Sequence, residues 1–182
     1  MEKIFNSRCN YILCGYIQLF FNKAVQRINF TAECRLVFPC NALCLPDNFN
    51  YYKVFIAKAD GAAGQIGKPI PARILGKTAI GKPVEGSTAT FLSIGKFHDE
   101  KEAMAVQKYI ATQFVRTLVA TLKATQNNTR DVWENVPLQD FTLSSDIDWT
   151  QSIENINKQL YIKYKLGKEE IEFIETMIQP MC

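Results

Sequence analysis

Histidine and paired cysteines are scarce in this chain of 182 residues. The single histidine is His98, so a catalytic triad has almost nothing to draw on. The six cysteines include no Cys-x-x-Cys, and Cys40 and Cys44 form one loose clamp without a second clamp. Structural zinc usually takes two such clamps. The sequence therefore disfavours a zinc site, and it shows no secretory context for a disulfide framework.

A long apolar run is also missing. Residues 11–21 (YILCGYIQLFF) are apolar apart from Gly15 and Gln18, but this stretch is too short to span a bilayer. No small-residue cleavage site follows it at a convincing distance. We expect a buried segment here, no membrane partner and a cytoplasmic location.

A complete nucleotide-binding loop is absent. Residues 60–71 (DGAAGQIGKPIP) contain three of the nine glycines and end in Gly67-Lys68. The first glycine of a Walker loop would stand at Ala62, and its magnesium-binding hydroxyl at Pro69. Because both positions fail, we expect a basic glycine loop that meets phosphate in some other way.

Catalytic signatures are lacking as well. The chain has neither a glycine-rich loop for S-adenosylmethionine nor the Asn-Pro-Pro-Tyr type of motif that holds a flipped base. Asp47, Asp99 and Lys101 fit the frame of a metal-dependent nuclease, in which two carboxylates hold magnesium near a lysine. Asp47 is also explained by a turn, and Asp99 by a helix cap. A small nuclease is kept as an alternative function.

Charge is distributed unevenly along the chain. Residues 53–130 carry twelve Lys and Arg against five Asp and Glu, whereas residues 131–182 carry four against ten. With 47% apolar residues the chain can bury a real core. A basic centre beside an acidic tail fits a surface that faces nucleic acid and a solvated helical end.

Periodicity predicts strands followed by helices. Strand-like stretches occupy residues 51–59, 72–75, 78–80 and 87–94. Residues 99–123 form the clearest helix, capped by Asp99, and two shorter helices are expected after Asp146, separated at Gly167. The long helix carries one apolar stripe, which should pack on the sheet: Ala103, Val106, Ile110, Phe114, Leu118 and Leu122.

The basic centre supplies the candidate DNA contacts. Within thirty residues Asp60 is the only acid, and strands and glycine turns add backbone N–H groups, a combination that suits phosphate contacts. Gln65, Arg73 and Arg130 are candidates for reading base edges. The full set of candidate DNA-binding residues is Lys53, Lys58, Gln65, Lys68, Arg73, Lys77, Lys82 and Arg130.

Four segments resemble one protein family over residues 51–181: YKVFIAKADGAAGQIGKPIPARILGK, STATFLSIGKFHDEKEAMAVQKYIATQFVRTLV, TRDVWENVPLQDF and LYIKYKLGKEEIEFIETMIQPM. Together they resemble the C-terminal target recognition region of bacterial adenine-specific restriction–modification DNA methylases, including type II enzymes that fuse methylase and endonuclease. That region is similar to the specificity-subunit modules of type I systems. The VPLQDF box and the KYKLGKEEIEFIETMI ending carry most of the resemblance.

The resemblance implies an α+β fold, with a twisted mixed β-sheet packed by a long helix and a C-terminal helical hairpin. It divides the chain into an atypical segment (1–50), a DNA target recognition domain (51–145) and the hairpin (146–182). It further implies sequence-specific binding of double-stranded DNA, without a catalytic site, cofactor or metal in this chain. S-adenosylmethionine, and Mg²⁺ where cleavage occurs, would be used by the parent enzyme. A module that docks a methylase or restriction subunit is a further alternative.

Overall fold

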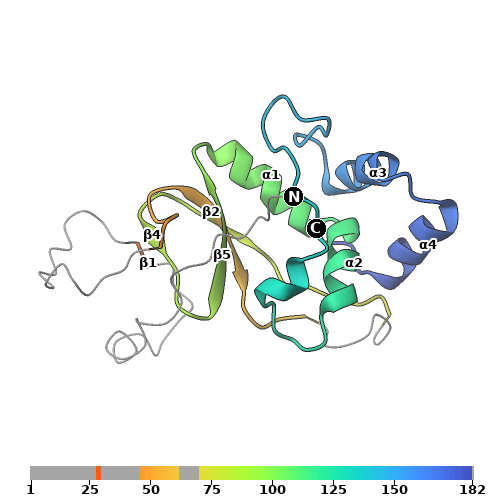
Figure 1. The fold of residues 1–182 in the computed structure, drawn as a ribbon, viewed down its shortest axis with the longest axis horizontal. Coiled ribbons are helices and arrows are strands. Elements are labelled where there is room, and N and C mark those ends of the chain that lie inside the picture. Colours follow the sequence, from red (N-terminus) through yellow and green to blue (C-terminus); the bar gives the residue numbers. More distant parts are fainter. Residues whose placement is uncertain (1–27, 30–45, 62–69, 182) are drawn as a thin grey trace, which may run out of the picture.

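A small antiparallel sheet forms one half of the molecule. The computed structural model describes residues 28–29, 46–61 and 70–181. Strand β2 (Tyr52–Ala57) lies between β3 (Ala79–Gly81) and β5 (Phe91–Phe97), and both pairings are antiparallel. A separate pair joins β1 (Ile28–Asn29) to β4 (Glu85–Gly86). The sheet lies to the left and the helices to the right in Figure 1.

The α+β class is confirmed, but the expected mixed strand direction is corrected. Within the described ranges, the parallel pairing found is the isolated bridge between Ala72 and Ile178, and residues 72–75 form no strand beyond it. The strand expected at residues 87–94 begins instead at Phe91, because residues 88–91 form a turn in which Phe91 N–H donates to Thr88 O at 3.1 Å.

The central strand β2 is covered on both faces. Val54 and Ile56 are fully buried and belong to the main core, on the face packed by α1. Phe55 points to the opposite face, as alternation along a strand requires, and its ring lies over Gly81. β2 is therefore the buried central strand of the sheet.

The predicted long helix is two helices, α1 (Glu100–Ala111) and α2 (Gln113–Leu122). Asp99 caps α1 as expected, accepting from Lys101 N–H at 3.0 Å. The break lies at Thr112, whose ψ of 148° is extended. Thr112 Oγ1 donates to Tyr109 O and accepts from Val115 N–H, so the hydroxyl joins the end of one helix to the start of the next.

The break also ends the predicted apolar stripe. Asn157 Oδ1 accepts from Phe114 N–H at 3.0 Å, which satisfies a free donor in the first turn of α2. Ala103, Val106, Ile110 and Phe114 are buried, but Leu122 is 41% exposed because α2 presents a different face to the core. Counting apolar residues at the helical period assumes one straight helix, so it could not reveal the change of direction at Thr112.

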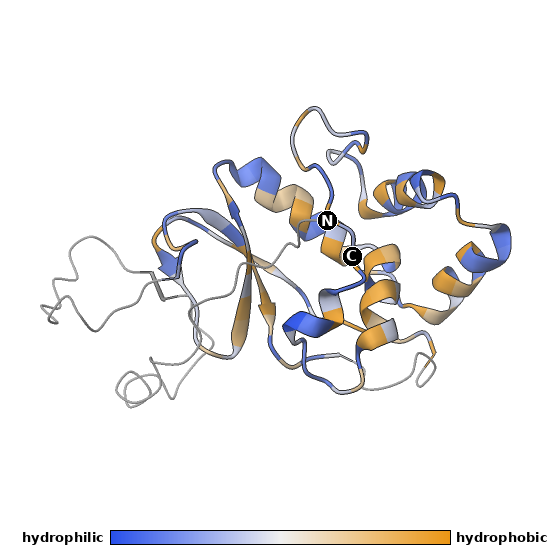
Figure 2. Ribbon diagram, viewed as in Figure 1, coloured by the Kyte–Doolittle hydropathy of each residue, from blue (hydrophilic) through white to orange (hydrophobic). Residues whose placement is uncertain are grey.

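Two helices complete the chain, α3 (Ile153–Lys163) and α4 (Lys168–Met177). Ser152 caps α3, and Gly167 precedes α4 with its N–H donating to Glu170 Oε2 at 2.7 Å. Both helices pack on α2. Figure 2 shows α2 coloured largely hydrophobic and the junction of α3 and α4, at the right, hydrophilic. The expected C-terminal pair of helices is confirmed.

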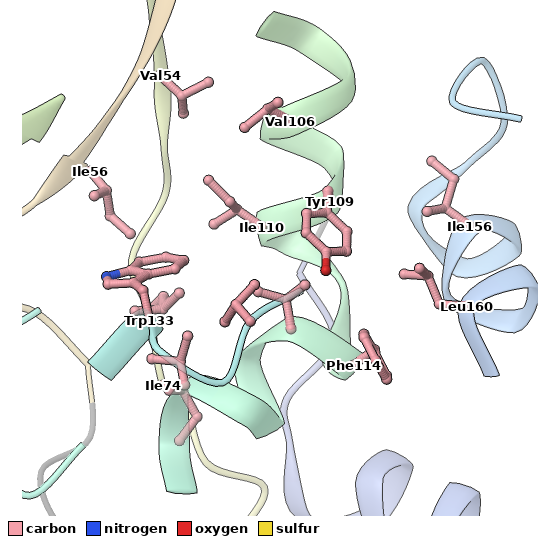
Figure 3. Packing of buried hydrophobic residues seen from close by; sticks show 14 of the residues in the cluster. Val54, Ile56, Ile74, Val106, Tyr109, Ile110, Phe114, Trp133, Ile156 and Leu160 are labelled. Carbon is pink, nitrogen blue, oxygen red and sulfur yellow. The ribbon is translucent and has the colours of Figure 1, made fainter. Parts of the chain in front are cut away.

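One core joins all these elements. Figure 3 shows Val54 and Ile56 facing Val106 and Ile110 of α1, with Trp133 of the 3₁₀ helix η1 (Arg130–Trp133) beside them. Ile156 and Leu160 of α3 approach α1 from its other side. After α4 the chain returns to the sheet half, where Gln179 N–H donates to Ala72 O at 3.0 Å. Residues 146–182 thus share their core with the segment before them.

Candidate nucleic-acid interface

The strand register gathers several cations at the C-terminal end of β2. Because β3 and β5 run antiparallel to β2, both strands begin where β2 ends. Lys58 directly follows β2, and Lys77 lies two residues before β3. Both side chains are exposed. The strand register therefore places two of the predicted phosphate contacts at the same end of the sheet.

A distant segment adds Arg130 to the same place. Ala59 forms an antiparallel bridge with Asn127, and Asn128 N–H donates to Lys58 O at 2.7 Å. Asn128 Nδ2 also donates to Ala57 O at 2.8 Å. This seam holds residues 127–128 against the end of β2, and the exposed Arg130 follows two residues later at the start of η1.

Arg73 completes the group through an ion pair. Its Nη2 donates to both carboxylate oxygens of Asp60 at 2.9 Å, and Asp60 Oδ1 also accepts from Gly61 N–H. A Cβ at Gly76 would lie 1.6 Å from Asp60 Oδ2, so a side chain there would displace the Asp60 carboxylate. We call Lys58, Arg73, Lys77 and Arg130 the cationic end.

Arg73 is less free than the sequence indicated. Its side chain is 58% exposed, but its fork already holds a carboxylate. A base edge would have to compete with Asp60 for the same donors. In this structure Arg73 is held by the Asp60 carboxylate.

Lys53 is a correction to the predicted set. It is only 1% exposed, and its Nζ donates to the carbonyl oxygens of Asn48, Phe49, Tyr51 and Lys82 at 2.9–3.2 Å. The ring of Phe55 lies 6.0 Å from the ammonium. Burial lowers the pKa of Lys53 to about 8, and Glu85 opposes that shift. Lys53 is an internal cross-link and does not reach a DNA phosphate.

The remaining predicted residues lie elsewhere. Lys82 is exposed, but it follows β3 and so sits at the opposite end of the sheet. That end is about 17 Å from the cationic end at the rise of an antiparallel strand. Gln65 and Lys68 lie outside the described residues, as do the glycine-loop core, the Cys40–Cys44 clamp and the apolar run at 11–21.

Two further features of this region lie outside the predicted set of DNA-binding residues. Thr88 and Thr90 precede β5 at the cationic end, with their hydroxyls 2.6 Å apart, and Thr90 O accepts from Lys58 N–H. Lys123 is 2% exposed and donates to Asp60 O and Ile74 O. Burial lowers its pKa to about 8, with Asp60 opposing. The threonines carry a weak composition signal, whereas nothing in the sequence marks Lys123.

The residues of the nuclease alternative lie on separate elements. Asp99 caps α1 and lines an open groove of about 410 Å³ with Lys101, Glu102 and residues 141–144. Asp47 lies in the turn before β2 and is not among the residues that line this groove. Over residues 46–61 and 70–181, no three His, Cys, Asp or Glu side chains are grouped as metal ligands.

Comparison with known proteins assigns no family to the chain. None of the helices in the described part of the chain has the length and apolarity needed to cross a membrane. No protein-family model, no curated protein and no solved structure matches the chain.

Proposed function

We propose that this chain binds double-stranded DNA through the cationic end. The observation that carries the proposal is that three separate segments deliver Lys58, Arg73, Lys77 and Arg130 to one end of one sheet. Two carboxylates, Asp60 and Asp131, lie on the same segments, and Asp60 is paired with Arg73. The group therefore keeps a net positive charge, which favours phosphate.

The side chains divide into two roles. Lys58 and Lys77 are point charges suited to the phosphate backbone, with the hydroxyls of Thr88 and Thr90 as further donors beside them. Arg130 offers a planar fork that matches guanine. We propose that the lysines set affinity and that Arg130 contributes to sequence preference.

The biological setting we propose is target recognition in an adenine-specific restriction–modification methylase, in the cytoplasm. It follows from the sequence resemblance over residues 51–181, and the cationic end supplies the surface such a role needs. Methyl transfer from S-adenosylmethionine would then be performed by a methylase domain or subunit with which this region works.

Salt dependence of binding tests the proposal. Two phosphate contacts, from Lys58 and Lys77, give a slope of about −1.8 in log K against log salt, so affinity falls about tenfold from about 50 to 200 mM salt. We expect fluorescence anisotropy on a short duplex of random sequence to show this slope. Lys58→Gln/Lys77→Gln should weaken binding to all sequences and flatten the slope by about 2.

The matched control is Lys158→Gln/Lys168→Gln, which removes the same charge from α3 and α4. It should leave the slope unchanged. No binding at low salt, or equal losses in both double variants, would contradict the proposal. Magnesium-dependent plasmid cleavage that is lost in Asp99→Ala would favour the nuclease instead.

A further inference from the structure

Lys123 joins two parts of the chain that are distant in sequence. It is the C-cap of α2, and its Nζ donates to Asp60 O and Ile74 O, each at 2.5 Å. These carbonyls stand on either side of the segment that contains the glycine loop. A buried ammonium that bonds to both therefore holds the two sides together, and neither carbonyl has another donor among the described residues.

We propose that Lys123 is a positioning residue for the cationic end. This inference rests on the proposed DNA binding for its functional part, while the structural part stands by itself. Lys123 is 2% exposed, so it acts on this end through the two carbonyls that it binds, those of Asp60 and Ile74. The carboxylate of Asp60 holds Arg73, and the backbone N–H of Asp60 donates to Gln126 O at 3.0 Å.

Each cation of this end is tied to the segment that Lys123 fixes. Lys58 lies two residues before Asp60, and Lys77 follows Gly76, which abuts the Asp60 carboxylate. The bond from Asp60 to Gln126 also anchors the segment that leads to Arg130. Removing the ammonium takes away the donor that the described residues give to both carbonyls, so we expect their segments to shift.

Lys53 provides an internal control for this inference. It is equally buried and also donates to backbone carbonyls, but at the other end of β2. Lys53→Met and Lys123→Met remove the same buried charge from the same protein. A loss that depends only on net charge or on general stability appears in both variants, whereas a positioning effect appears only in Lys123→Met.

Hydrogen exchange of the full chain without DNA tests the structural part. In Lys123→Met we expect the amides of Asp60 and Asn128 to exchange at least about tenfold faster, with the amides of Tyr51 and Val84 unchanged. Lys53→Met should show the reverse. Unchanged protection of Asp60 in Lys123→Met would overturn the proposal whether or not the chain binds DNA.

Anisotropy on random-sequence duplex tests the functional part. Lys123→Met should weaken binding by about tenfold, the cost of losing a contacting residue, whereas Lys53→Met should not. In a double-mutant cycle, Lys123→Met should be non-additive with Lys58→Gln and additive with Lys82→Gln. Additivity with both would overturn the proposal. Absence of binding by the wild type would instead overturn the proposed function. The exchange result would still decide whether Lys123 holds the segments of Asp60 and Ile74 together.

A second variant covers the case in which Lys123→Met does not fold. Asp60→Asn keeps the Lys123 ammonium and its carbonyl partners but removes the charge that holds Arg73, at a partly exposed pair. Under the proposal it weakens DNA binding non-additively with Arg73→Gln. An Asp60→Asn protein that binds DNA more tightly, and additively with Arg73→Gln, would mean that Asp60 only repels phosphate and would overturn the proposed route.

Discussion

The two ends of β2 use lysine in opposite ways. At the N-terminal end, Lys53 is buried and donates to four carbonyl oxygens, so this cation of the basic stretch is internal. At the C-terminal end, the buried cross-link is Lys123, which comes from α2, and the lysines of the basic stretch itself are exposed. The comparison teaches that burial, rather than residue type or local density, decides which cations can meet a ligand.

Replacing the two lysines at the N-terminal end should give the largest difference in stability. We expect Lys53→Met to lower the free energy of unfolding by about 3 kcal/mol, since hydrogen bonds to a charged group are lost from buried carbonyls. Lys82→Gln, which alters an exposed neighbour, should change it by less than about 0.5 kcal/mol. Urea unfolding followed by circular dichroism measures both. Equal effects would mean that the Lys53 cross-link carries no stability.

Two glycines allow the ends to be compared again. A Cβ at Gly81 would lie 2.3 Å from the Phe55 ring, and one at Gly76 would strike the Asp60 carboxylate. Gly81→Ala should cost about 2 kcal/mol, because a packed ring has to move. Gly76→Ala should cost less, because the end of an exposed side chain can rotate away, but it should separate Asp60 from Arg73. Thermal unfolding ranks the two variants, and the reverse order would contradict this account.

Alkaline titration probes both buried lysines together. Their folded-state pKa values of about 8 lie below the ordinary value of 10.5, so from pH 8 to 10 the unfolded chain binds more protons. The free energy of unfolding should therefore rise over this range by up to about 2 kcal/mol for each lysine, since one pKa unit corresponds to about 1.4 kcal/mol.

Tyrosine sets the upper limit of this rise. Burial raises the pKa of Tyr161 to about 12, against an ordinary value of 10, so above pH 10 the unfolded chain loses this proton first and stability falls. Urea unfolding at stepped pH should place the maximum near pH 10. A Lys53→Met/Lys123→Met protein should lack the rising limb, and a flat profile in the wild type would contradict the lowered lysine pKa values.

Much of the fold could be predicted from the sequence, for physical reasons. The strand at β2 and the C-terminal helices follow from periodicity and caps, which are local properties. The break at Thr112 could not be found in this way, because it depends on Asn157, which lies far away in the chain. Strand direction likewise depends on pairing between segments, and the strands of the described residues pair antiparallel where a mixed sheet was expected.

The candidate site was predicted less completely than the fold. Lys58, Lys77 and Arg130 are exposed as a DNA contact requires, but their proximity comes from the bridge of Ala59 to Asn127, which has no sequence signature. Lys53 was wrong because a dense basic stretch does not show which ammonium turns inward. Whether any of these residues binds DNA stays a prediction.

The corner at Thr112 has a consequence for how the two halves of the protein are coupled. α1 packs on the sheet and on α3, whereas α2 packs on α3 and α4, so the turn at Thr112 sets the direction of α2 relative to β2. A continuous helix of the same residues would run straight for about 33 Å and offer both partners one shared face. The turn instead gives α1 and α2 two differently directed faces, and α3 packs against both of them, so the C-terminal helices are attached to each side of the corner.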